Sequence, residues 1–172
     1  MNVICPRCGK TNTTPFSDSV FHTHGYECAD CKKDFGVDDG KSLAEWEDEL
    51  ISLEYERVSK DQTKKKLILK KDEKTGKAII TPSIIYPDKM MQPIEPQDVT
   101  QSFDMLKKLI FEKIYILDWN RINVGLVLGK DESFMVRLKF SSKPEISFSG
   151  TNKFPPYLVV LDQLFASFFE LE

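Results

Sequence analysis

The sequence of 172 residues contains no apolar run of the roughly 18–20 residues that a membrane-spanning helix needs. Its first residues, Met-Asn-Val-Ile-Cys, have neither the basic start nor the apolar stretch of a secretory signal peptide. Hydrophobic residues make up 41% of the chain and charged residues 30%, which is the balance of a globular protein rather than a disordered one. We therefore expect a soluble cytoplasmic protein with no membrane partner.

Several enzyme signatures are missing as well. Neither G-x-G-x-x-G nor G-x-x-x-x-G-K-[ST] occurs, so the common nucleotide-binding loops are not indicated. A PD-(D/E)xK nuclease needs a second carboxylate with a lysine two positions after it, and no such pair follows Pro87-Asp88. Ser-His-Asp chemistry would have to use His22 or His24, the only two histidines. We expect that the protein is not an enzyme.

Charge is unevenly distributed along the chain, although the net charge is only −3. The net charge is −1 over residues 1–41, −5 over residues 42–61 and +3 over residues 62–172. The middle segment is therefore acidic and the C-terminal segment mildly basic. This imbalance is too small to predict nucleic-acid binding by itself.

Cysteine is scarce, and all four cysteines belong to two C-x-x-C pairs, Cys5-Pro6-Arg7-Cys8 and Cys28-Ala29-Asp30-Cys31. Two intervening residues let both thiolates reach one ion from a tight turn. Two such turns supply four sulfur ligands in a tetrahedron, which suits one structural Zn²⁺ without a vacant coordination position. Gly9 follows the first pair, where a turn often requires positive φ, but Lys32 has the matching place in the second.

Other uses of these cysteines are less well supported. Disulfides are rare in cytoplasmic proteins. A redox C-x-x-C normally occurs singly on a thioredoxin-like βαβ unit, and no such pattern surrounds either pair. Iron in a rubredoxin-like site has similar geometry, but such sites usually have glycine after both pairs, unlike Lys32. A domain of about 40 residues cannot bury enough apolar surface to fold alone, and metal binding of roughly 10–16 kcal/mol can supply the missing stability.

The motif C-P-x-C-G at residues 5–9, followed by C-x-x-C at residues 28–31, resembles the zinc ribbon family over residues 1–37. The resemblance implies a small zinc-ribbon β-hairpin domain, which we place at residues 1–41 with strands at 11–16 and 20–27. It leaves the role open, because zinc ribbons serve in DNA binding, RNA binding, protein contacts and scaffolding. His22 and His24 are expected on one face of the hairpin, either as plain polar surface or as a contact surface.

The rest of the chain predicts a linker helix at 42–50 and an α+β domain at 51–172. Ser42-Leu43-Ala44-Glu45 is a capping-box signature, and the acidic side chains that follow suggest a solvated helix face. Periodicity predicts strands at 51–55, 64–71 and 78–86, a helix at 97–117, strands at 123–128, 134–140 and 145–148, and a helix at 157–169. The order βββ-α-βββ-α predicts an antiparallel sheet with helices on one face.

Two features of the C-terminal segment bear on partners. Apolar residues nearly encircle the helix expected at 157–169, so it must be buried in the core or in an interface with a homodimer mate or another protein. Over about 55 residues, the segment 114–171 resembles the accessory module of restriction-endonuclease-like proteins, through Arg137-Leu138-Lys139-Phe140 and Leu161-Asp162. This resemblance implies a link to nucleic-acid systems and no catalytic residue.

Two hypotheses of function follow from the sequence. The first is a non-catalytic zinc-binding protein associated with nucleic acid, and its basic contact residues are Arg7, Lys10, Lys32, Lys33, Lys64, Lys65 and Lys66. The simpler interpretation of the last three lysines is edge protection and solubility. The second hypothesis is a protein-interaction adaptor that uses the acidic linker and the aromatic C-terminal helix.

Overall fold

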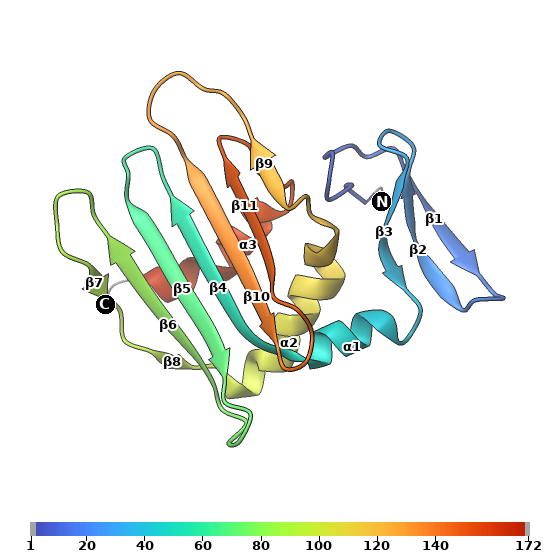
Figure 1. Ribbon diagram of the computed structural model, residues 1–172, viewed down its shortest axis with the longest axis horizontal. Coiled ribbons are helices and arrows are strands. Elements are labelled where there is room, and N and C mark those ends of the chain that lie inside the picture. Colours follow the sequence, from blue (N-terminus) through green and yellow to red (C-terminus); the bar gives the residue numbers. More distant parts are fainter. Residues whose placement is uncertain (1–2, 171–172) are drawn as a thin grey trace.

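The computed structural model describes residues 3–170 and has a mixed α+β architecture, as predicted (Figure 1). A small antiparallel sheet lies beside a larger sheet whose helices are gathered on one face. The small sheet has the order β1-β2-β3, with β1 (Thr13–Asp18), β2 (Thr23–Cys28) and β3 (Lys33–Asp38). No helix within residues 3–170 combines the length and the apolar character that crossing a membrane requires.

The large sheet is connected to the small one by helix α1 (Ser42–Asp48). Its order is β7-β6-β5-β4-β10-β11-β9, and β8 also pairs with β6. The strands are β4 (Leu50–Val58), β5 (Lys64–Lys71), β6 (Ala78–Ile85), β7 (Gln92–Pro93), β8 (Gln97–Asp98), β9 (Ile122–Val124), β10 (Ser133–Phe140) and β11 (Ile146–Thr151). The helices are α2 (Phe103–Lys108) and α3 (Leu158–Ala166), and both lie behind the sheet in Figure 1.

Alternation along the strands separates a buried face from an open face. On β5, Leu67 and Leu69 are fully buried beneath the helices, whereas Ile68 and Lys70 point to the opposite side. No helix covers that opposite side within residues 3–170, as Figure 1 shows. We call this side of β4, β5, β6 and β10 the open face. The described chain therefore forms one layer of helices against one sheet, with the second side of the sheet free.

The predicted elements differ from the structure in three places. The N-terminal segment of residues 3–38, which we call the ribbon, has a third strand, β3, which the sequence pattern did not indicate. The strand predicted at 123–128 is only three residues long and pairs in parallel with β11, so the sheet is not wholly antiparallel. The segment after β6, predicted as a loop, contributes the short edge strands β7 and β8. The strands β7, β8 and β9 are short pairings that tertiary contacts stabilise, and their residues show no local periodicity that would predict them.

The helix predicted at 97–117 is also wrong as a single element. It is divided into a 3-10 turn, α2, a π turn at Leu109–Lys113 and a second 3-10 turn. Tyr115 has φ 54°, a left-handed conformation that stops a helix. The indole Nε1 of Trp119 donates to the carbonyl of Ile114 at 2.9 Å, which satisfies a backbone group that the interrupted helix leaves free.

Helix α3 belongs mainly to the core. Leu158, Leu161 and Phe165 are buried, while Val159 and Val160 remain exposed. The ring of Phe165 packs edge-on against Tyr55 of β4, with a centroid distance of 5.2 Å. The apolar pattern of this helix is thus explained largely by packing within the chain.

Helix α1 differs from its predicted cap and surface. Its N-terminal amides are capped by the carboxylate of Asp39, which accepts from the backbone N–H of Lys41 and of Ser42, and not by Ser42. Glu47 is buried rather than solvated, and this burial raises the pKa of its carboxyl. Glu49 accepts hydrogen bonds from the hydroxyl and backbone N–H of Ser142. The acidic linker is therefore partly engaged with the large domain.

Candidate metal centre and basic surfaces

The four cysteines converge on one point. Their sulfur atoms all lie within 4.8 Å of one another, with Cys5 and Cys31 at 3.7 Å and Cys8 and Cys28 at 3.6 Å. A tetrahedral site with metal–sulfur bonds of about 2.3 Å has sulfur–sulfur edges of about 3.8 Å. The sulfur cluster therefore has the size that one four-coordinate ion requires, and none of the four cysteines is in a disulfide.

The two cysteine turns have the same backbone form despite their different sequences. The N–H of Gly9 donates to the carbonyl of Cys5 at 3.0 Å, and the N–H of Lys32 donates to the carbonyl of Cys28 at 2.9 Å. Gly9 has φ 74° and Lys32 has φ 57°. Glycine adopts this conformation freely, but lysine does so only at a cost. The second cysteine turn thus holds Lys32 in a conformation that lysine does not favour.

This strain makes Lys32 a site for stabilisation. We expect Lys32→Gly to raise the melting temperature of the ribbon. Glycine removes a left-handed penalty of about 1–2 kcal/mol in the folded state, and its greater conformational freedom in the unfolded chain offsets only part of this gain. Differential scanning calorimetry of the metal-loaded chain measures the shift. Lys33→Gly, one residue further into β3, is the matched control and should lower the stability. Equal destabilisation by both variants would contradict the strain argument.

Electrostatics at the cluster favour a bound cation. The backbone N–H of Cys31 is the main cause that lowers the pKa of the Cys28 thiol to about 7, so this ligand ionises readily. Burial instead raises the pKa of the Cys31 thiol to about 12, and the neighbouring Cys28 and Cys5 sulfurs raise it as well. A divalent metal removes this conflict by stabilising all four thiolates together.

The ribbon has its own small core, which continues into the large domain. Cys5, Cys28 and Phe35 are fully buried, and the ring of Tyr26 stacks on Phe35 at 5.4 Å. Tyr115, from the segment after α2, packs edge-on against Phe35, also at 5.4 Å. The left-handed turn that ends the helix therefore places an aromatic ring of the large domain in the core of the ribbon.

A polar clamp, formed by Arg7, Asp34, Gly36 and Asp118, fastens the ribbon to the large domain. The guanidinium of Arg7 donates to the Asp118 carboxylate at 3.0 Å and to the backbone carbonyl of Asp34 at 2.7 Å. The other carboxylate oxygen of Asp118 accepts from the backbone N–H of Gly36 at 2.9 Å. Burial raises the pKa of Asp118, and the Gly36 N–H and Arg7 oppose that rise. Arg7 is thus occupied within the protein and does not present its charge to a partner.

The clamp is expected to contribute to stability. Arg7→Ala should lower the free energy of unfolding by about 1–3 kcal/mol, because it leaves a half-buried carboxylate with one hydrogen bond fewer. Asp118→Asn and the double variant complete a cycle whose coupling energy we expect near 1 kcal/mol, measured by urea unfolding. Lys10→Ala, on the exposed side of the same turn, is the control and should change stability by less than about 0.5 kcal/mol. Additive effects of the two clamp variants would contradict a direct interaction.

The other predicted basic residues fall on separate surfaces. Lys10, Lys32 and Lys33 are exposed on the ribbon. The ammonium of Lys64 pairs with Glu56 at 2.7 Å, and that of Lys65 lies 5.4 Å from the ring centre of Phe169 on the helix side. Lys66 lies on the open face. The pleat of β5 thus places Lys65 on the helix side and Lys64 and Lys66 on the open face, and Lys64 is already paired there with Glu56.

The open face carries a groove that sequence reasoning did not find. It has a volume of about 1170 Å³ and lies over β6, β5, β4 and the end of β10, beside the hairpin at residues 72–77. Its floor includes Ile51, Ile68 and Ile79, all half-buried. Its lysines are Lys70, Lys71, Lys74, Lys77 and Lys139, and its carboxylates are Glu54, Asp72 and Glu73. Only the pairing of β4, β5, β6 and β10 brings these residues together.

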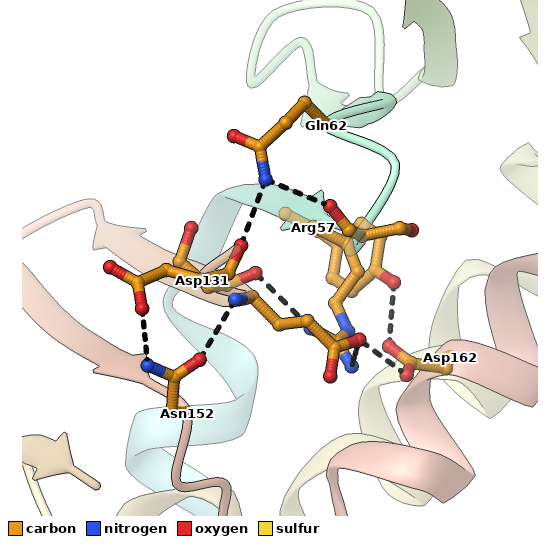
Figure 2. A network of polar contacts seen from close by, with 9 residues as sticks. Arg57, Gln62, Asp131, Asn152 and Asp162 are labelled. Carbon is orange, nitrogen blue, oxygen red and sulfur yellow. Dashed lines mark hydrogen bonds and ion pairs between the residues drawn. The ribbon is translucent and has the colours of Figure 1, made fainter. Parts of the chain in front are cut away.

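A second polar cluster, shown in Figure 2, has a structural role. Tyr55 donates to Asp162 of α3 at 2.6 Å, and Arg57 contacts the same carboxylate at 3.4 Å. The guanidinium of Arg57 also lies over the ring of Phe154, 4.4 Å from its centre. Nearby, Asn152 links the loop before β10 to the end of β11 through Asp131 and Glu132. These contacts brace α3 and two loops against the sheet.

The two histidines do not share a strand face. His22 lies in the turn between β1 and β2 with φ 53°, whereas His24 lies on β2, 3.8 Å from the carboxylate of Asp38. Neither belongs to the cysteine cluster.

Comparison with protein-family models, curated proteins and solved structures gave no match to this chain. A four-cysteine centre that can hold one metal ion, set in an α+β fold, is what the residues themselves establish.

Proposed function

We propose that this protein is a non-catalytic module that holds one Zn²⁺ and associates with nucleic acid. Four thiolates in a tetrahedral cluster suit zinc, and with all four coordination positions taken by protein there is no site for an activated water. The metal would then maintain the shape of the ribbon and of the surface that the clamp joins to it.

The observation that carries the nucleic-acid proposal is the charge of the open-face groove. Of its three carboxylates, Glu54 is paired with Lys139 and Arg137, at 3.3 and 3.5 Å, and the other two, Asp72 and Glu73, are outnumbered by the four lysines Lys70, Lys71, Lys74 and Lys77. Within residues 3–170, by contrast, no carboxylate forms a salt bridge with Lys70, Lys74 or Lys77. The groove thus offers positive charge to a polyanion.

Fluorescence anisotropy with a labelled 20-nucleotide single strand, titrated with metal-loaded protein at increasing salt, tests the association. We expect binding whose logarithmic salt dependence has a slope of about −2, as for three neutralised phosphates on a single strand. Zinc is tested by elemental analysis, with one metal atom per chain expected. An absence of binding at 50 mM salt, on both single-stranded and duplex probes, would contradict the association. A metal other than zinc would contradict only the metal assignment.

A second candidate function, a protein-interaction adaptor, is favoured by one feature of the loop between β9 and β10. Leu126 and Leu128 are almost completely exposed, at 99% and 105% of their reference areas, and Val127 is half exposed. Solvent-exposed apolar clusters mark interaction sites. The surfaces that the sequence suggested for an adaptor are less suitable, because Phe165 and Phe169 of the C-terminal helix are buried.

Replacing both leucines tests the adaptor. If the loop contacts protein, Leu126→Ser combined with Leu128→Ser should abolish self-association seen by sedimentation velocity, or remove specific partners from an affinity isolate of the wild type. Met90→Ser, at an equally exposed apolar side chain in another loop, is the control. Identical behaviour of the wild type and the double variant in both measurements would contradict this candidate.

A further inference from the structure

The open-face groove combines two kinds of surface that a nucleic-acid duplex does not match. Its floor is aliphatic, through Ile51, Ile68 and Ile79, and its free lysines stand at one end, on β5 and on the hairpin that follows it. A duplex presents phosphates on its outside and keeps its base faces stacked within. A ligand for this groove must offer an apolar face and negative charge together.

The dimensions of the groove point the same way. It extends from Ile79 and Thr81 of β6 across β5 and β4 to Lys139 of β10, which is three interstrand spacings, or about 14 Å. This width accommodates one chain of nucleotides lying on the sheet. The exposed Thr81 adds a hydroxyl group that can bond to base edges.

Glu54 would repel such a ligand if its charge were free. The carboxylate lies between the two cations Arg137 and Lys139, at 3.5 and 3.3 Å, and both cations also reach Glu145, at 3.1 and 4.0 Å. Because these two cations and two carboxylates balance, the centre of the open face carries no net charge. The remaining positive charge of the groove comes from the lysines at the hairpin end. The hairpin end holds the four lysines Lys70, Lys71, Lys74 and Lys77 against the two carboxylates Asp72 and Glu73, so the net positive charge of the groove lies at that end.

We propose that the groove binds single-stranded nucleic acid, with bases against the isoleucine floor and phosphates at the hairpin lysines. This inference rests on the proposed association with nucleic acid and adds the form of the ligand and its place on the molecule. Aliphatic side chains give weaker contact to bases than aromatic rings do, so the affinity depends strongly on the lysines.

Two variants of the metal-loaded full chain test the isoleucine floor and the hairpin-end lysines, which we call the rim, separately. The floor variant is Ile68→Ser with Ile79→Ser, and the rim variant is Lys70→Glu with Lys74→Glu and Lys77→Glu. Val159→Ser on α3 and Lys113→Glu after α2 are the matched controls, since both side chains are exposed on the helix side. Circular dichroism and thermal melting confirm that each variant is folded. The probes are an oligothymidylate of 12 nucleotides and a 12-base-pair duplex, with polyglutamate as competitor.

We expect the wild type to bind the single strand about tenfold more tightly than the duplex. The floor variant should lose about fivefold to tenfold on the single strand and nothing on the duplex, and the rim variant should lose at least tenfold on both. Equal wild-type affinity for both probes, full binding by a folded floor variant, or equal competition by polyglutamate would overturn the inference. If Lys10→Glu with Lys32→Glu and Lys33→Glu abolishes binding while both groove variants retain it, the association stands and this site does not. If the wild type binds neither probe, both the proposed association with nucleic acid and the groove site are contradicted.

Discussion

Removal of the metal is expected to unfold the ribbon, residues 3–38, while the large domain stays folded. The ribbon core within the described residues is little more than Cys5, Cys28 and Phe35 with partly buried neighbours. Metal binding worth roughly 10–16 kcal/mol exceeds what so small a core can replace. The large domain has a separate and far larger apolar cluster, which extends from Leu50 to Phe169. We therefore expect the ribbon to unfold when the metal is removed and the large domain to unfold separately, on heating or in denaturant.

Two-dimensional amide NMR of the full chain, before and after treatment with a chelator, measures this directly. Signals of residues 3–38 should collapse into the unfolded range, and those of β4, β5 and β10 should keep their dispersion apart from shifts near Tyr115 and Asp118. Cys28→Ser should reproduce the chelated spectrum without chelator. Lys10→Ala, a residue in the first cysteine turn that is not a ligand, should leave it unchanged. A dispersed ribbon spectrum in metal-free protein would contradict the structural role of the site.

The second large effect is expected at Phe165. Phe165→Ala should lower the free energy of unfolding by about 3–5 kcal/mol, because it leaves a cavity between α3 and Tyr55 of β4 in a fully buried position. Urea unfolding followed by tryptophan fluorescence gives the value, since Trp119 lies in the same core. Val160→Ala, on the exposed side of α3, should change stability by no more than about 0.5 kcal/mol.

The same pair of variants distinguishes the core from an interface. If α3 served mainly as a binding surface, Phe165→Ala would leave the monomer nearly as stable as the wild type and change its association state instead. A loss of less than about 1 kcal/mol, together with an altered sedimentation coefficient, would contradict the packing described here. The prediction also bears on the aromatic-helix adaptor, which requires these rings at the surface.

Local patterns predicted the elements that local interactions stabilise. The two C-x-x-C pairs predicted the sulfur cluster, because two tight turns with this spacing can bring four sulfurs to one ion. Alternation predicted β10, and a short apolar run enclosed by lysines predicted β5; each strand has one buried face. The break after α2 was missed because apolar residues continue at helical spacing through Ile114. Tyr115 leaves the helix to pack on Phe35 of the ribbon, and no local pattern records that contact.

The basic surfaces show the same limit. Arg7 has the sequence context of a free cation beside a metal site, yet its partner Asp118 lies 111 residues away. Lys64, Lys65 and Lys66 are consecutive, but the pleat places Lys65 on the opposite face from the other two, and Lys64 is paired with Glu56. No sequence pattern indicates that Lys70 and Lys139 line one groove, since only the pairing of β4 with β5 and with β10 brings them to the same surface.

By itself, then, the sequence determined the four-cysteine cluster, the α+β class and the helix-covered face of the sheet. Each depends on residue spacing within one turn, one strand or one helix, where chain geometry alone fixes which side chains are neighbours. Only the tertiary structure decided which charges are paired inside the protein and which remain for a ligand. Electrostatic neighbours are set by strand order and domain docking, and neither leaves a periodic signal in the order of the residues.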